Sequence, residues 1–217
     1  MGYRLLIRGL SACGLPQSGL PQSGLPQWGL PAFVAAALLT GCAGPKLVTY
    51  TLTLAPATTP DTLLARKPVV ISVSAITVPN DVDGTDVMVR DGSILRRSPT
   101  GRWASRLSVG VTSRLAERLA ERYPQMLVTT TPVSDTPAMS IRINISRLDV
   151  GADGTGVLEA DWTTVPADAR QPERQQRVRI VQSGSVATDA DVVALVGQLI
   201  DALAADIEVG PLPRSSR

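Results

Sequence analysis

The chain has 217 residues, of which 44% are hydrophobic and 18% are charged, a balance typical of a folded domain rather than of a disordered chain. It contains no His, which excludes Ser-His-Asp and Cys-His catalysis and His-ligated metals. Its two Cys residues, Cys13 and Cys42, are too few for a disulfide framework or a Cys-rich zinc site. The length predicts one domain, or two small ones.

The net charge argues against a nucleic-acid partner. The chain has 21 Lys and Arg against 19 Asp and Glu, which gives a formal charge of +2. Residues 1–41 contain Arg4 and Arg8 and no acidic residue, so the remainder carries 19 charges of each sign. Proteins that bind nucleic acid normally show a basic excess or stripe. We therefore expect no nucleic acid among the partners.

The N-terminal segment is typical of a bacterial export signal. Arg4 and Arg8 form a basic n-region, and residues 30–40 form an apolar run that is too short to span a membrane. This run ends in Leu39-Thr40-Gly41-Cys42, which resembles the lipobox of bacterial lipoproteins. The alternative is a buried structural Cys within an apolar segment.

The lipobox resemblance implies that the chain is cleaved after Gly41 and that Cys42 is lipidated. Its sulfur would carry a diacylglycerol and its new amine an acyl chain, and no other cofactor is expected. Several acyl chains on one residue hold a protein on a membrane far more firmly than one. Because Ala43 rather than Asp follows the Cys, the resemblance to Gram-negative lipoproteins implies a position on the periplasmic face of the outer membrane.

A five-residue repeat, Gly-Leu-Pro-Gln-Ser, lies between the n-region and the apolar run, over residues 14–31. Pro at this spacing prevents a helix, and no known solenoid has this period. We interpret it as a tandem expansion within a discarded segment, or as a sign of a misplaced start codon. The predicted organisation is therefore a signal peptide (1–41), a lipidated tether (42–47), one domain (48–210) and a C-terminal tail (211–217).

Strands are predicted where apolar and polar residues alternate and β-branched residues are frequent. Asp91-Gly92 is a dipeptide favoured in tight hairpin turns, and Leu148 and Val150 fall out of phase with the strand before them, which predicts a bulge. A second change of phase, near residues 74–75, predicts another bulge. The expected strands span residues 48–54, 69–78, 87–90, 93–97, 126–130, 139–145, 157–164 and 177–182.

Two amphipathic helices are predicted. The first spans residues 103–123, where Leu107, Val111, Leu115 and Leu119 recur every fourth residue until Pro124 ends the helix. The second begins with a capping-box-like Thr188-Asp-Ala-Asp191 and ends before Gly210. Two helices far apart in the sequence cannot cover both faces of a parallel sheet. We therefore expect an α+β two-layer sandwich, with a mixed, mostly antiparallel sheet and both long helices on one face.

Several short motifs follow one another along these elements: Tyr50-Thr-Leu52, Val78-Pro79, Val87-Met-Val-Arg90, Arg102-Trp-Ala104 and Leu158-Glu-Ala-Asp-Trp162. Together with the order of the elements, they resemble the ABC-type transport auxiliary lipoproteins, the PqiC (YmbA-like) family. The resemblance covers nearly the whole mature chain. Two departures are the missing aromatic residue after Val78-Pro79 and Ser105-Arg106 in place of the usual Glu-Pro.

This resemblance implies a non-enzymatic role. Such lipoproteins are similar to outer-membrane partners of systems that contain a mammalian-cell-entry (MCE) domain protein and an inner-membrane transporter component. These systems are thought to move lipids between membranes or to preserve envelope integrity, and the resemblance also allows a homo-oligomeric ring. The alternative is an LptE-like assembly lipoprotein, which has a similar α+β build but partners a β-barrel.

Several polar and aromatic residues could serve a site or the fold. Trp162 is expected in the core, while Trp103 could be core or interface. Arg90 is expected in a structural ion pair beside Asp86 and Asp91. The row Arg114, Arg118 and Arg122 is expected on a solvated face rather than against lipid headgroups. The carboxylates Asp81, Asp83, Asp86 and Asp91 are better explained by turns than by calcium binding or catalysis.

Overall fold

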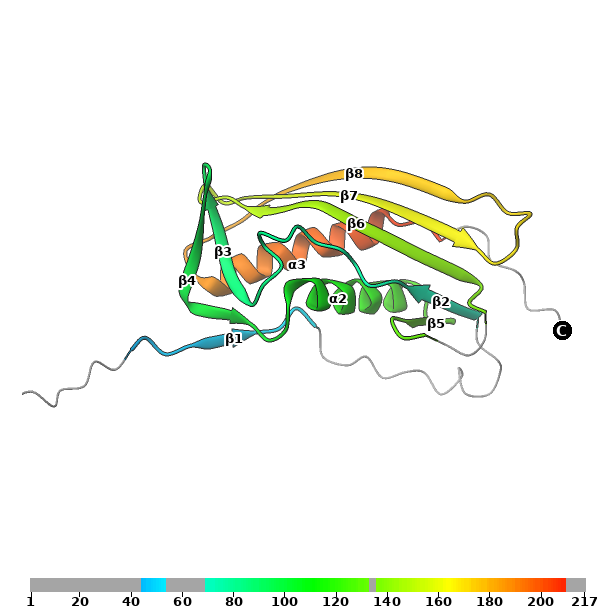
Figure 1. The fold of residues 1–217 in the computed structure, drawn as a ribbon, viewed down its shortest axis with the longest axis horizontal. Coiled ribbons are helices and arrows are strands. Elements are labelled where there is room, and N and C mark those ends of the chain that lie inside the picture. Colours follow the sequence, from blue (N-terminus) through cyan, green and yellow to red (C-terminus); the bar gives the residue numbers. More distant parts are fainter. Residues whose placement is uncertain (1–43, 54–68, 133–135, 210–217) are drawn as a thin grey trace, which may run out of the picture. The chain divides into compact units, whose positions relative to one another are not determined.

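The computed structural model describes residues 44–53, 69–132 and 136–209. These contain eight strands and two helices, labelled as in Figure 1. Neither helix of this described part is long and apolar enough to cross a bilayer. The strands are β1 (Val48–Tyr50), β2 (Val69–Val73), β3 (Asp86–Asp91), β4 (Ile94–Trp103), β5 (Met126–Thr129), β6 (Met139–Val150), β7 (Thr155–Pro166) and β8 (Arg174–Ser183), and the helices are α2 (Leu107–Arg122) and α3 (Asp189–Asp206).

The strands form two mixed sheets. One has the order β1-β4-β3 and the other the order β5-β2-β6-β7-β8. Strand β1 is parallel to β4, and β2 is parallel to both β5 and β6, while β6, β7 and β8 form an antiparallel meander. Both helices lie on the same side of the five-stranded sheet (Figure 1). The predicted α+β fold is confirmed, although the strands divide between two sheets instead of joining in one.

The core lies between the meander and the helices. In β6, Ile141, Ile143 and Ile145 are at most 5% exposed, and the intervening residues face solvent. Leu199 and Leu203 of α3 are fully buried opposite them. Each such side chain contributes about 2 kcal/mol of hydrophobic stabilisation. The strict alternation in the sequence therefore identified the buried face of the sheet correctly.

The predicted strand over residues 69–78 is shorter than expected, because β2 ends at Val73. Beyond it, the backbone N–H of Ile76 donates to Oγ1 of Thr112 on α2, at 3.0 Å. Thr77 then pairs again with Asn144 of β6, and its carbonyl accepts from the N–H of Ile145 at 2.9 Å. Between the pairs Val73–Ile141 and Thr77–Asn144 the chain has one residue more than β6, so the bulge predicted near residues 74–75 is present, although the regular strand ends at Val73.

The first helix begins later than predicted, at Leu107 rather than Trp103. Trp103 is the last residue of β4, and its backbone N–H donates to the Thr85 carbonyl at 2.7 Å. Its side chain is 6% exposed, so it belongs to the core. The apolar residues that recur at every fourth position start only at Leu107, and the residues before it carry no helical pattern.

Two local predictions are confirmed. The register of β6 against β7 shifts between Ile145 and Arg147, where the sequence predicted a bulge. The bulge keeps Leu148 and Val150 buried despite their change of phase. Thr188 caps α3 in a reciprocal capping box with Asp191.

Replacing Leu115 or Leu199 with Asp should abolish the cooperative unfolding transition. Both side chains are fully buried, and an unpaired carboxylate in their place costs several kcal/mol of a total stability of about 5–15 kcal/mol. Circular dichroism during urea or thermal unfolding measures this. The control is Val109→Asp, at a 53% exposed position in the first turn of α2, where an acidic residue is favourable. A wild-type transition in either core variant would refute the helix packing.

Candidate functional site

The chain that follows Cys42 is fixed to the domain at its first described strand. Strand β1 pairs in parallel with residues 101–103 of β4, and the N–H of Ala104 donates to the Tyr50 carbonyl at 2.7 Å. Leu52 is 3% exposed and packs on α2 at Gly110, where an added Cβ would lie 3.4 Å from its side chain. The chain is therefore part of the folded domain from β1 to Leu52, directly after the predicted tether.

Arg114 of α2 secures the same segment from the other side. Its Nη1 donates to the Leu52 carbonyl at 2.9 Å, while its Nε and Nη2 donate to the two carboxylate oxygens of Asp201 on α3, each at 2.8 Å. Gly197 of α3 leaves the space for this guanidinium, because a Cβ there would lie 3.0 Å from it. One side chain thus connects the segment after β1, α2 and α3.

Asp201 accepts a second bidentate pair from Arg118, with Nε and Nη2 each at 2.9 Å from its oxygens. Partial burial alone would raise the pKa of the Asp201 carboxyl, but the hydrogen bonds and charges of Arg114 and Arg118 together lower it below its ordinary value. The pKa of Arg118 is raised by its hydrogen bonds to Asp201 and Glu121. We call Arg114, Arg118 and Asp201 the interhelical cluster.

The expectation of a solvated row at Arg114, Arg118 and Arg122 is therefore wrong. Arg122 also faces α3, where its Nη1 donates to the carbonyl of Ala205 at 2.6 Å near the end of the helix. A cation near the last carbonyls of a helix satisfies acceptors and complements the helix dipole. The row binds one helix to the other.

A signal for this cluster was present in the sequence. Asp201 is the only charged residue between Val192 and Ala205, in a helix that is otherwise almost entirely apolar. A lone carboxylate on a packed helix predicts a basic partner, since an unpaired buried charge is costly. The neighbouring acidic residues on the first helix obscured that partner, because they made its arginines resemble a surface pattern.

The four carboxylates that could have formed a metal or acid–base site are dispersed into separate ion pairs. Among the described residues, no three His, Cys, Asp or Glu side chains converge as metal ligands. Arg90 lies in a structural ion pair as expected, but its partners are Asp149 at 2.7 Å and Asp81 at 3.2 Å instead of Asp86 and Asp91. The remaining pairs are Asp83–Arg106, Asp86–Arg97, Asp86–Arg102 and Asp91–Arg96.

The aromatic candidates belong to the core. Trp162 is 2% exposed, as predicted, and its indole Nε1–H donates to Oδ2 of Asp206 at the end of α3, at 2.9 Å. Trp103 is also buried. Cys42, the predicted lipidation site, lies outside the described residues.

Comparison with known proteins identifies the family. Residues 50–208 match the ABC-type transport auxiliary lipoprotein component family, which covers well over half of the chain. The chain belongs to this family. As a member, it is an auxiliary lipoprotein component of ABC-type transport, in agreement with the resemblance found in the sequence. No curated protein matches the chain in sequence.

Solved structures share this fold at low sequence identity. A crystal structure of an uncharacterised protein superposes with a TM-score of 0.60 at 15% identity, covering 74% of this chain and 95% of the other. Protein XCC0632 from Xanthomonas campestris superposes with a TM-score of 0.54, also at 15% identity, covering 73% and 91%. At these identities the similarity concerns the fold alone.

Replacing Asp201 with Asn should lower the free energy of unfolding by about 1–2 kcal/mol at pH 7, less than for a fully buried ion pair because the carboxylate is 29% exposed. Because the folded-state pKa of Asp201 is depressed, its stabilisation is present above about pH 4 and is lost as the pH falls through the folded value. The free energy of unfolding, measured with urea, should therefore differ less between Asp201→Asn and wild type at pH 3 than at pH 7.

Glu121→Gln is the matched control, since Glu121 pairs with Arg118 at 2.7 Å but is 43% exposed. This change should cost less than about 0.5 kcal/mol. An equal decrease in the free energy of unfolding for Asp201→Asn and Glu121→Gln would contradict the inference that Asp201 holds the interhelical cluster together.

Proposed function

We propose that this auxiliary lipoprotein is non-enzymatic and is anchored by Cys42 to the periplasmic face of the outer membrane. There it docks the periplasmic conduit protein, an MCE-domain protein, of an intermembrane lipid-transport or envelope-integrity system that also contains an inner-membrane transporter component. Family membership supports the transport role. The lipobox and Ala43 support the anchor and the membrane.

The observation that carries the proposal is the short, well-secured connection between Cys42 and the domain. Only five residues separate Cys42 from Val48, the first residue of β1. From β1 onward the chain is held by sheet hydrogen bonds, by the burial of Leu52 and by Arg114. A long flexible linker would let the domain travel through the periplasm, but this tether keeps it beside the lipid. Such an arrangement suits a docking component that must stay at one membrane.

The mechanism is one of positioning. The acyl chains hold the domain at the bilayer, and the interhelical cluster joins the segment after β1, α2 and α3 in one unit. A partner that binds this unit is thereby brought to a fixed height above the membrane. Assembly of several copies into a ring belongs to the same proposal and would multiply the contacts with the conduit protein.

Cys42→Ser should leave the precursor uncleaved and remove the protein from the outer-membrane fraction. The hydroxyl oxygen of Ser does not replace the sulfur that receives the lipid. Membrane fractionation and the mass of the N-terminal peptide measure the two effects. Cys13→Ser is the matched control, because Cys13 lies in the segment that cleavage removes, and it should behave like wild type. Normal outer-membrane recovery of Cys42→Ser would contradict the anchor.

Crosslinking in cells identifies the partner. Recovery of an MCE-domain protein with the wild-type lipoprotein, and its loss with Cys42→Ser, is the result expected for a docking component. Recovery of a β-barrel protein instead would favour the LptE-like role and overturn the proposed conduit partner.

A further inference from the structure

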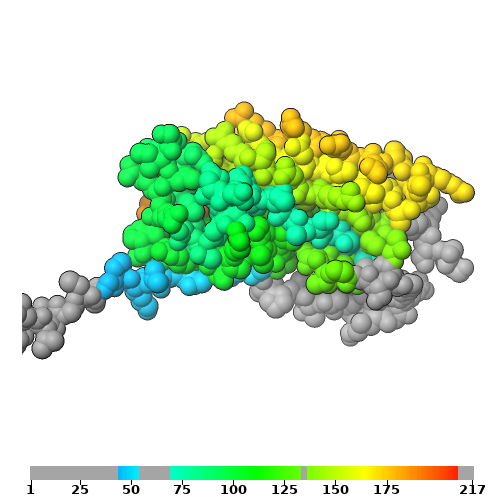
Figure 2. Space-filling view, in the orientation of Figure 1, coloured from blue at the N-terminus to red at the C-terminus, as the bar shows by residue number. Residues whose placement is uncertain are grey.

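The surface around the start of β1 combines exposed apolar and basic side chains. Val48 lines one open groove together with Arg96, Arg97 and Pro99 of β4, and Leu47 precedes Val48 in the tether. We call Leu47, Val48, Arg96, Arg97 and Pro99 the anchor-end surface. In Figure 2, β1 lies against the lower part of the β3–β4 hairpin, in agreement with its pairing with β4.

Covalent geometry keeps this surface close to the lipid. A fully extended chain spans at most about 3.6 Å per residue, so the six steps from Cys42 to Val48 reach no further than about 22 Å. The inference rests on the acylation of Cys42 proposed above. If the acyl chains are in the bilayer, the start of β1 cannot leave its vicinity, and the residues beside it are the first to meet lipid headgroups.

The chemistry of the anchor-end surface fits a bilayer interface. Leu47 is 60% exposed and Val48 is 42% exposed, although large apolar side chains of a folded domain are usually covered. The side chains of Arg96 and Arg97, in the groove that Val48 also lines, are 65% and 72% exposed, and they pair with Asp91 and Asp86 at the side of this groove. Apolar side chains next to basic ones enter the headgroup region together, the former by burial and the latter by attraction to phosphate.

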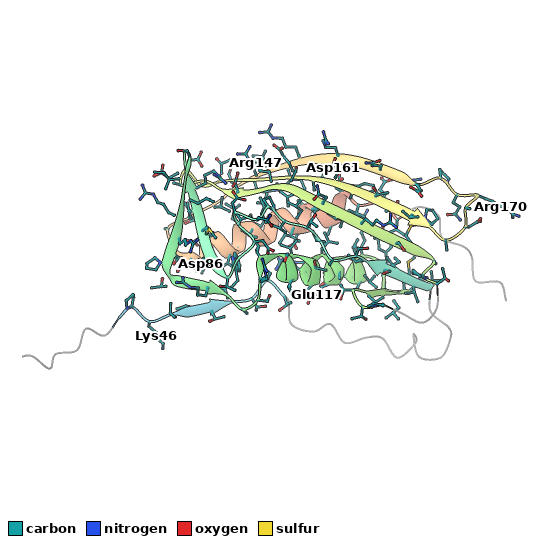
Figure 3. The ribbon with its side chains drawn as sticks, viewed as in Figure 1. Lys46, Asp86, Glu117, Arg147, Asp161 and Arg170 are labelled. Carbon is teal, nitrogen blue, oxygen red and sulfur yellow. The ribbon has the colours of Figure 1, made fainter. Side chains whose placement is uncertain are left out.

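The opposite end of the domain is distant from this surface. Figure 3 shows Lys46, next to Leu47 in the tether, and Arg170, in the β7–β8 connection, at opposite ends of the domain. Strand β7 alone has 12 residues, which at about 3.3 Å per residue extend for about 40 Å. If the anchor-end surface touches the bilayer, Arg170 stands well away from it.

We propose that the anchor-end surface lies directly on the lipid bilayer that holds Cys42, with Leu47 and Val48 at the headgroup boundary and Arg96 and Arg97 at the level of the phosphates. The domain then stands with its β7–β8 connection directed away from the membrane. The occupant of this surface is a lipid headgroup layer and not a protein, because Val48, which lines the groove, follows the short tether directly and is therefore held near the membrane.

Site-specific labelling of the acylated lipoprotein tests this orientation. Cleavage removes Cys13 and acylation blocks Cys42, so one introduced Cys is the single free thiol of the mature chain. Arg97→Cys and the matched variant Arg170→Cys, both at exposed positions, would carry an environment-sensitive fluorophore. The proteins are reconstituted into vesicles of phosphatidylethanolamine and phosphatidylglycerol in which a fraction of the headgroups bears a quencher.

The expected result is several-fold stronger quenching at position 97 than at position 170, and an increase in emission at position 97 on transfer from detergent to vesicles. Equal quenching at both positions, or stronger quenching at position 170, would overturn the proposed orientation while leaving the anchor intact. Failure of both proteins to float with the vesicles, with no acyl mass on Cys42, would instead refute the anchor on which the inference rests.

Discussion

Arg114 makes the contacts on which the rest of the arrangement depends. From α2 it donates to the Leu52 carbonyl just after β1 and to both oxygens of Asp201 on α3. Three segments that are far apart in the sequence therefore share one guanidinium. Five rigid donors in a planar fork suit this geometry, and Lys would supply only a point charge. The positions of the segment after β1 and of both helices are consequently not independent.

This constraint gives the family's auxiliary role a physical basis in this chain. A lipid anchor fixes only one end of a protein, and a loose linker would leave the domain free to tumble. Here β1 begins at Val48, and Leu52 already belongs to the packed core. A lipid on Cys42, as proposed, would therefore hold the whole α+β unit through a short connection. The outer face of β6–β8 is polar and lies on the side of the sheet away from the helices (Figure 3). It carries cross-strand ion pairs such as Asp161–Arg177.

Local patterns predicted much of the fold, because they report local physics. Each of these patterns follows from one buried face or one capped helix end. Examples are the alternation in β6, the apolar residue at every fourth position of α2 and the capping box at Thr188. The division into two sheets and the extension of β4 to Trp103 depend on pairing between distant strands, which no local period encodes. The interhelical cluster was missed for the same reason, since the partner of Arg114 lies 87 positions away.

The central claim is that a covalent lipid on Cys42 begins the mature chain. Mass spectrometry of the N-terminal peptide, taken from the native membrane, tests it most directly. The account predicts a peptide that starts at Cys42 and carries the combined mass of a diacylglycerol and an amide-linked acyl chain. A peptide with an unmodified Cys42 thiol, or one that begins upstream of it, would contradict the account.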